Sequence, residues 1–177
     1  QAVFFNQNAA DDTARAEIIA KVAELAGPGE VRGLLHSLAF GTLAKFVGEK
    51  AVTRKQMEMT LDVMGTSLVY WSQDLVRAGL LGQGGRIWAM TSSGSHMVWP
   101  GYGPVSAAKA VLEATCRQLA VELAPQGITT NAILAGVTDT AALRKIPGNE
   151  LLIEKALARN PMGRLTTPAD VADFPVV

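Results

Sequence analysis

Residues 84–136 read GGRIWAMTSSGSHMVWPGYGPVSAAKAVLEATCRQLAVELAPQGITTNAILAG. The stretch begins with an apolar, β-prone run entered through glycines, which predicts a strand over 84–93. A helical run follows at 104–124, with a proline near its first position and Gly127 after its end, as helices prefer. A second β-prone run at 128–136 completes a strand–helix–strand unit. Because such a crossover joins parallel strands, the stretch predicts a parallel sheet.

Strands alternate with helices before this stretch as well. Two apolar runs predict strands and two periodic stretches predict helices, and in chain order these ranges are 2–6 (strand), 12–27 (helix), 31–41 (strand) and 53–81 (helix). After the stretch, residues 138–160 predict a polar loop with a short helix at 149–158. A last helix begins near residue 167, with Thr167 as its N-cap, Pro168 at the first position and Asp170 at the third.

These elements predict an α/β fold, namely a Rossmann-like, doubly wound parallel sheet covered by helices on both faces. We expect residues 1–177 to form one domain of this type, with a substrate-binding loop at 138–160. No Gly-rich phosphate loop stands between a strand and a helix, and the N-terminal strands and the final strand of such a sheet are absent. We therefore expect about 60–90 further residues in front, with a Gly-rich turn among them, and a final strand behind.

The composition excludes several classes of partner. Lys+Arg and Asp+Glu both number 16, so no net charge attracts nucleic acid or an anionic membrane. The lone cysteine, Cys116, allows no intramolecular disulfide and no thiolate metal cluster, and it fits a reducing, cytoplasmic compartment. No apolar run reaches membrane-spanning length. A hydrophobic content of 49% indicates helices buried on more than one side, as in an oligomer.

Small and polar residues gather where the predicted strands end. In parallel sheets, ligands bind beyond the carboxyl ends of the strands. Four such clusters follow predicted strands, and they are Asn8–Ala9, Ser37–Gly41, Thr91–Gly94 and Ala135–Thr140. The sequence therefore predicts a ligand site at that edge of the sheet.

The stretch YGPVSAAK places Tyr102 and Lys109 with six residues between them. Within one regular helix this gap returns to nearly the same face but rises about 10 Å, too far for the two side chains to touch. Gly103 and Pro104 indicate that the helix begins after Tyr102. The tyrosine would then lie in the entering loop, forward of the lysine.

With these features placed, the chain resembles the short-chain dehydrogenases/reductases, and most of all their enoyl-acyl-carrier-protein reductase branch. The matching stretches are HSLAFG (36–41), TSSGSHMVWPGYGPVSAAKAVLEA (91–114), GITTNAILAGVTDT (127–140) and NPMGRLTTPADVA (160–172). Most members of the superfamily have three residues between the active tyrosine and lysine, whereas six is the enoyl-reductase pattern. Ser92 stands where the main enoyl-reductase class has a second tyrosine, and Ala135 replaces the usual proline.

The resemblance implies NADH- or NADPH-dependent reduction of the C=C bond of an enoyl thioester, possibly carried on acyl carrier protein, by a homotetramer. Catalysis would fall to Tyr102, which donates to the thioester oxygen, to Lys109, which holds the nicotinamide ribose, and to Ser92. Phe40 would line the acyl pocket beside Tyr102. The implied cofactor-binding residues are Asn8, Ser37, Ala39, Thr91, Lys109, Gly136, Thr138 and Thr140.

Several of these residues have a purely structural alternative. Ser92 could cap a strand end, Ser37 and Ala39 could allow tight packing between sheet and helix, and Phe40 could belong to the core. We expect His36 to be a structural hydrogen-bonding residue. At the level of function, two alternatives stay open: a keto- or hydroxy-reductase of the same superfamily, and a catalytically silent member that serves as a binding partner.

Overall fold

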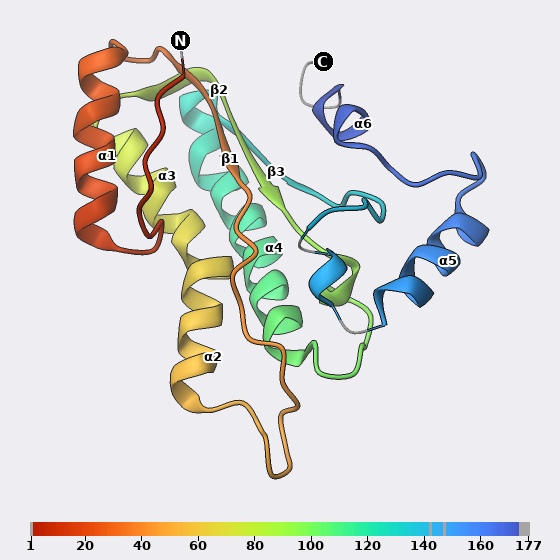
Figure 1. Cartoon of the computed structure of the whole chain (residues 1–177). Helices are drawn as coiled ribbons and strands as arrows, with labels where there is room; N and C mark the ends of the chain where they lie inside the picture. The colour runs from red at the N-terminus through yellow and green to blue at the C-terminus, as the bar shows by residue number, and fades with distance from the viewer. Residues whose placement is uncertain (1, 142, 147, 174–177) are drawn as a thin grey trace. The chain divides into compact units, whose positions relative to one another are not determined.

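The computed structural model describes residues 2–141, 143–146 and 148–173, and it divides into two compact units, Gln1–Ile133 and Leu134–Val177 (Figure 1). We describe each unit by itself. The expectation of one domain over 1–177 includes positions 1, 142, 147 and 174–177, which lie outside the described residues, and it stays a prediction.

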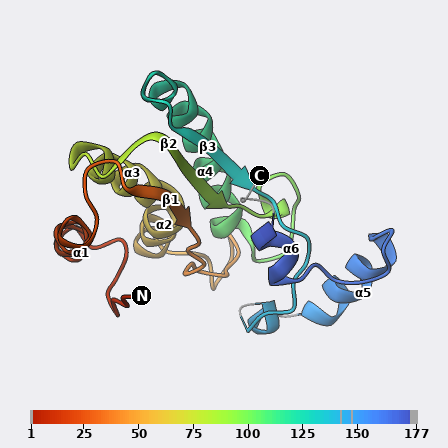
Figure 2. The same cartoon turned by 90° about the horizontal axis from the view of Figure 1, so that it is seen from above.

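The first unit contains a three-stranded parallel sheet in the order β1-β2-β3, as Figure 2 shows. The strands are β1 (Val31–His36), β2 (Leu81–Met90) and β3 (Thr129–Ile133). The register pairs Leu34 with Ile87 and His36 with Ala89, so the carboxyl ends of β1 and β2 lie side by side. The predicted parallel sheet is confirmed, and its strands end where the polar clusters begin.

The helices of the first unit follow the predicted order. They are α1 (Asp12–Leu25), α2 (Arg54–Leu61), α3 (Ser67–Arg77) and α4 (Gly103–Leu123), with short helical turns η2 (Ser93–Ser95) and η3 (Ala124–Gln126). Asp11 caps α1 by accepting from the Ala14 amide, and Thr53 forms a reciprocal capping box with Gln56 at the start of α2. These caps explain where α1 and α2 begin.

The predicted single helix over 53–81 is interrupted by a π-helical segment, η1 (Asp62–Thr66). Hydroxyl groups along the helix donate to the carbonyl four residues back, for example Ser67 to Val63 at 2.8 Å and Ser72 to Leu68 at 2.7 Å. Such bonds compete with the backbone ladder and favour irregular turns. Gly65 within η1 lets the helix approach α4, since a β-carbon there would lie 3.0 Å from the Ala108 carbonyl oxygen.

The main core lies between one face of the sheet and the helices α3 and α4. Ile87 and Ala89 of β2 are fully buried, and they pack with Leu68 of α3 and Leu112 of α4. Burying each large aliphatic side chain contributes roughly 1.5–3 kcal/mol, so this layer fixes the sheet against the helices. On the opposite face of the sheet, Leu35 remains 57% exposed.

The predicted strand at 2–6 is wrong, because the described residues in that range form no strand. Val3, Phe4 and Phe5 are exposed, Phe4 at 90%. A β-prone run becomes a strand only beside another strand that accepts its hydrogen bonds, and β1 pairs only with β2 among the described residues.

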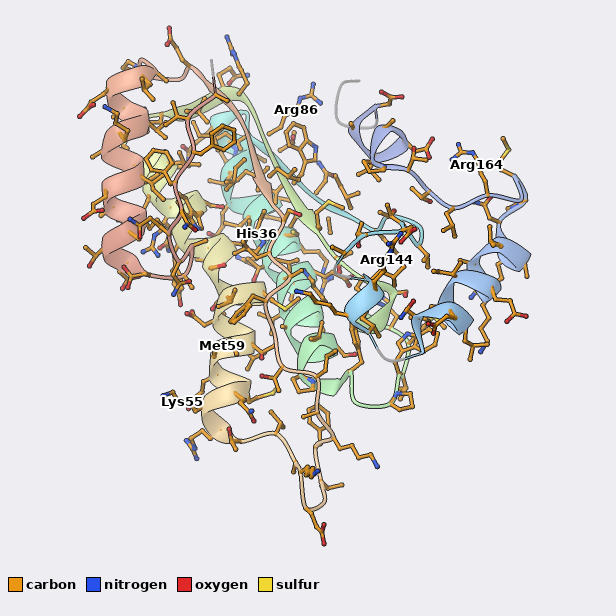
Figure 3. All side chains as sticks on the ribbon, viewed as in Figure 1. His36, Lys55, Met59, Arg86, Arg144 and Arg164 are labelled. Carbon is orange, nitrogen blue, oxygen red and sulfur yellow. The ribbon has the colours of Figure 1, made fainter. Side chains whose placement is uncertain are left out.

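The second unit contains η4 (Leu143–Lys145), α5 (Asn149–Arg159) and α6 (Pro168–Asp173). The predicted short helix in the 138–160 loop is therefore confirmed as α5. Thr167 caps α6 as predicted, because its hydroxyl accepts from the Asp170 amide at 3.2 Å and Asp170 accepts from the Thr167 amide at 2.7 Å. Arg164, labelled in Figure 3, forms two hydrogen bonds to the Asp170 carboxylate, at 2.6 and 2.9 Å.

In the described part of the chain, no helix combines the length and the apolar character needed to cross a membrane.

Candidate active site

The candidate site of the first unit lies where β1 and β2 end and α4 begins. Ser37 and Leu38 follow β1, Thr91 and Ser92 follow β2, and Tyr102 immediately precedes α4. Two of the predicted catalytic groups are in direct contact, since the Tyr102 hydroxyl lies 3.2 Å from the Ser92 Oγ. The structure therefore brings these two side chains together.

Tyr102 occupies the N-cap position of α4, which confirms that the helix begins after it. Two backbone hydrogen bonds fix the position of Tyr102. Its amide donates to the Trp99 carbonyl at 3.1 Å, and its carbonyl accepts from the Ser106 amide at 2.9 Å. Its ring lies against Gly94, where a β-carbon would clash with the ring atoms. The Gly94 position thus needs glycine for the ring to lie where it does.

Lys109 is buried, with 5% of its surface exposed, and its ammonium lies between the two strand ends. Nζ donates to the Met90 carbonyl at 2.7 Å and to the Leu38 carbonyl at 3.3 Å. An ammonium has three N–H donors. One N–H is therefore left without a partner among the described residues, and it could donate to a ligand. Burial lowers the pKa of Lys109 to about 8.

His36 acts as a structural hydrogen-bonding residue, as expected (Figure 3). Its Nε2 lies 2.8 Å from the Ser67 Oγ, and the Ser67 hydroxyl donates to Val63. The Ser67 proton is thereby used, so His36 must be the donor in this pair. Burial, and to a smaller extent the positive charge of Lys109, lowers the pKa of His36 to about 4, so the ring is neutral at neutral pH.

A hollow of about 230 Å³ lies beside the end of β1 and is lined by Ala9, His36, Ser37, Leu38 and Trp71, among others. The Trp71 indole donates to the Ala9 carbonyl at 2.9 Å, which holds the 8–10 turn beside the strand end. Asn8 closes that turn by accepting from the Ala10 amide at 3.1 Å. Ser37 and Ala39 are exposed at this edge, where a ligand could approach the backbone.

Two other predictions, for Phe40 and Thr91, are refined by side-chain exposure and contacts. Phe40 is 71% exposed, so its alternative role in the core is wrong, and contact with a substrate stays a prediction. The Thr91 hydroxyl donates its proton to Glu113 Oε1 on α4 at 2.7 Å, so this proton is already used within the protein. Glu113 was not predicted as a site residue, although it belongs to the AVLEA sequence that follows Lys109.

Gly136, Thr138 and Thr140 belong to the second unit. The Thr138 hydroxyl donates to the Gly136 carbonyl at 3.1 Å, and the Thr140 hydroxyl accepts from the Leu143 amide at 3.1 Å. A side chain at position 136 would clash with Thr166, so this turn also needs glycine. Their place beside Tyr102 and Lys109 stays a prediction.

Within the described residues, no cluster of three or more His, Cys, Asp or Glu side chains could hold a metal ion.

Comparison with protein families gives one match over the whole chain. The family described as Enoyl-(Acyl carrier protein) reductase matches residues 1–177. Enoyl-[acyl-carrier-protein] reductase [NADH] FabI of Aquifex aeolicus is 34% identical over 149 residues, which cover 84% of this chain and 55% of the relative. The [NADPH] enzyme of Staphylococcus aureus MRSA252 is 29% identical over 144 residues, covering 81% and 56%. The chain thus spans about half the length of these curated relatives.

Solved structures show the same similarity. The Aquifex aeolicus enoyl-[acyl-carrier-protein] reductase (NADH) has a TM-score of 0.81 at 29% identity, covering 95% of this chain and 65% of that chain. The Bacillus cereus enoyl-acyl carrier protein reductase, with NADP+ and indole naphthyridinone, has a TM-score of 0.85 at 25% identity, covering 96% and 65%.

The burial of Lys109 predicts a measurable dependence of stability on pH. Because the pKa is about 8 in the folded protein and 10.5 ordinarily, the unfolded chain binds more protons between these values. Stability conferred through this group must therefore rise with pH across that window. We expect the free energy of unfolding of the wild type, minus that of Lys109→Met, to rise by on the order of 3 kcal/mol between pH 8 and 10.5. Urea unfolding at several pH values measures this difference. A difference that stays constant or falls with pH would contradict the lowered pKa of Lys109.

Proposed function

The chain belongs to the enoyl-(acyl carrier protein) reductase family of the short-chain dehydrogenases/reductases, and we propose that the whole protein uses NADH or NADPH to reduce the C=C bond of an enoyl thioester. The observation that carries this proposal is the N-cap position of Tyr102, ahead of α4 and separated by six residues from the buried Lys109 at the same sheet edge. The relatives named above are called NADH- or NADPH-dependent enoyl reductases, which supports the proposed cofactor.

The described residues fit a dinucleotide at this edge. The hollow beside Ser37 and the exposed backbone at Ala39 leave space for a nucleotide to approach the strand end. The free N–H of Lys109 can donate to a ribose hydroxyl, and its positive charge suits a site that receives phosphate and hydroxyl groups. When bound, the nicotinamide would supply the hydride.

Tyr102 would stabilise the charge that develops on the substrate. Its hydroxyl would donate to the thioester oxygen, where negative charge accumulates when the β-carbon is reduced. That oxygen lies further from the reduced carbon than the oxygen of a ketone does. The N-cap position of Tyr102, ahead of the first turn of α4, is consistent with a donor displaced in this way while Lys109 stays near the cofactor.

The remaining assignments complete the proposal. Thr138 and Thr140, with Gly136, would meet the nicotinamide carboxamide, Asn8 would lie near the adenine, and Thr91 would contribute through its backbone. Phe40 would contact the acyl chain. The thioester could be carried on acyl carrier protein, which the names of the relatives mention. A cytoplasmic location stays a prediction.

A second candidate function is the reduction of a ketone, and the Ser92–Tyr102 pair favours it. Two neighbouring hydroxyls can both donate to one carbonyl oxygen, as a ketone reductase requires. The main enoyl-reductase class, which the chain resembles, has a tyrosine in place of Ser92.

A direct assay separates these candidates. We expect the whole protein to oxidise NADH or NADPH faster with a crotonyl thioester than with an acetoacetyl thioester, followed by nicotinamide absorbance. A preference for the acetoacetyl thioester would identify a keto-reductase. No oxidation with either substrate would support a catalytically silent member of the family.

Changing Tyr102 and Lys109 should give different kinetic defects. Tyr102→Phe removes the oxyanion donor but keeps the ring, so we expect turnover to fall roughly 100- to 1,000-fold with little change in cofactor affinity. Lys109→Ala should weaken cofactor binding as well, because it removes a ribose contact. Tyr70→Phe, on α3, is the matched control and should keep the wild-type rate. If Tyr102→Phe also keeps that rate, Tyr102 is not the oxyanion donor.

We also propose that the protein assembles as a homotetramer. Three apolar residues on one face of α4 are exposed in the described first unit, namely Ala110, Ala114 and Val121. Their spacing of four and seven residues places them on one face of α4, with the exposed Arg117 and Gln118 between Ala114 and Val121, and such a face suits pairing of identical helices across a two-fold axis.

Light scattering of the whole protein tests the assembly. We expect a tetramer at micromolar concentration and a smaller species for Val121→Glu, which places a charge on this face of α4. Val47→Glu is the control, because Val47 is also exposed, at 80%, but lies outside the helices. A monomeric wild type would exclude this assembly.

A further inference from the structure

Glu113, on α4 one turn beyond Lys109, makes contacts that the proposed mechanism does not use. Its side chain is only 15% exposed. Oε1 accepts from the Thr91 hydroxyl at 2.7 Å and from the Ser95 hydroxyl at 2.7 Å. Hydrogen bonds to an ionised carboxylate are about twice as strong as neutral ones, so these two contacts are strong links between α4 and the loop after β2.

The two residues that donate to Glu113 lie on either side of Ser92. Thr91 directly precedes Ser92, and its amide donates to the Ile133 carbonyl at 3.0 Å, which extends the β2–β3 pairing. Ser95 closes the η2 turn, since its amide donates to the Ser92 carbonyl at 3.0 Å. Ser92 therefore sits in a short segment fixed at both ends by the same carboxylate.

The position of the Ser92 hydroxyl depends on this segment. Ser92 Oγ accepts from the Gly94 amide at 3.2 Å, and it lies 3.2 Å from the Tyr102 hydroxyl. Both distances are at the long end for hydrogen bonds that involve a hydroxyl. A small displacement of the segment would therefore break the contact with Tyr102.

His96 also faces Glu113, but it is a weaker partner. Its Nε2 lies 3.6 Å from Glu113 Oε2, and its side chain is 72% exposed. Its Nδ1 lies 2.6 Å from the Ser95 Oγ. The Ser95 hydroxyl has one proton and two acceptors, Glu113 Oε1 at 2.7 Å and the Ser92 carbonyl at 2.8 Å, so Nδ1 acts as the donor to Ser95. The exposed His96 thus contacts Ser95 and Glu113 from the solvent side, whereas Oε1 of the half-buried Glu113 accepts from both Thr91 and Ser95.

We infer that Glu113 is a positioning residue, which holds the 91–95 segment and thereby keeps the Ser92 hydroxyl against Tyr102. The importance of Glu113 for turnover rests on the proposed function. Its role in keeping Ser92 within hydrogen-bond distance of Tyr102 is independent of that function. Glu113 itself need touch neither substrate nor cofactor. Its effect on the reaction passes through Ser92.

The substitutions separate the acceptor from the charge. Glu113→Met keeps the length of the side chain, but it leaves the Thr91 hydroxyl without its acceptor and the Ser95 hydroxyl with only the Ser92 carbonyl. Glu113→Gln keeps an Oε1 that can accept from both hydroxyls, but it loses the negative charge that strengthens these two bonds and that faces His96. Ser95→Ala removes one of the two links and serves if Glu113→Met does not fold. Glu122→Met, an exposed position near the end of the same helix, is the matched control.

The first readout needs no enzyme activity. In the whole protein labelled with [13Cζ]tyrosine, the Tyr102 resonance is the one absent from Tyr102→Phe. We expect Glu113→Met and Ser95→Ala to move this resonance in the same direction as Ser92→Ala does, whereas Glu113→Gln and Glu122→Met leave it near its wild-type position. An unmoved resonance in folded Glu113→Met or Ser95→Ala overturns the inference.

The second readout is turnover of the enoyl thioester. We expect Glu113→Met to lower turnover roughly tenfold or more, because small misplacements of catalytic groups are costly, and Glu113→Gln to restore most of it. In a Ser92→Ala background, Glu113→Met should have little further effect, because the group through which it acts is gone. Equal losses in both backgrounds would mean a general structural role and would overturn the inference. An inactive wild type would refute the proposed function alone, since the resonance of Tyr102 still tests the role of Glu113.

Discussion

The ammonium of Lys109 organises the candidate site, because it is buried and donates two of its hydrogen bonds to the backbone of the strand ends. It donates to the backbone carbonyl of Met90, the last residue of β2, and to that of Leu38, two residues beyond β1. A buried ammonium is costly unless such partners surround it. The two strand ends are thereby held at one point, and the parallel register of β1 and β2 places both carbonyls there. Lys109 therefore holds the ends of β1 and β2 together and is also a candidate ligand-binding group.

The surroundings of Lys109 are built from neutral groups. His36 is buried beside it and remains uncharged, since burial and the lysine charge both lower its pKa. Its ring is tied through Ser67 to the carbonyl of Val63, within the π-helical segment. The network therefore connects the end of β1 to the helix that follows it without adding a second charge. One turn further along α4, the carboxylate of Glu113 is turned toward Thr91 and Ser95.

Much of this arrangement could be predicted from sequence, but only where the signal is local. The start of α4 after Tyr102 followed from Gly103 and Pro104, and the cap of α6 followed from Thr167 and Asp170. The strand expected at 2–6 failed because propensity does not reveal whether a neighbouring strand exists. The π-helical interruption at 62–66 was not predicted, because hydrophobic periodicity does not report where hydroxyl groups such as that of Ser67 donate to the helix backbone. Glu113 was missed because its partners lie 22 and 18 residues earlier in the chain.

Gly65 lies outside the candidate site, but it sets how closely η1 packs against α4, the helix that carries Lys109. The carbonyl of Ala108, the residue before Lys109, is the nearest neighbour of a β-carbon at that position. A larger residue at 65 would force the backbones of η1 and α4 apart by a few tenths of an ångström, and Lys109 would move with its helix. Sequence change at this glycine would thus alter the distance between the ammonium and the strand ends. Divergence within the family could alter the reach of the lysine in this way while every residue of the site stays the same.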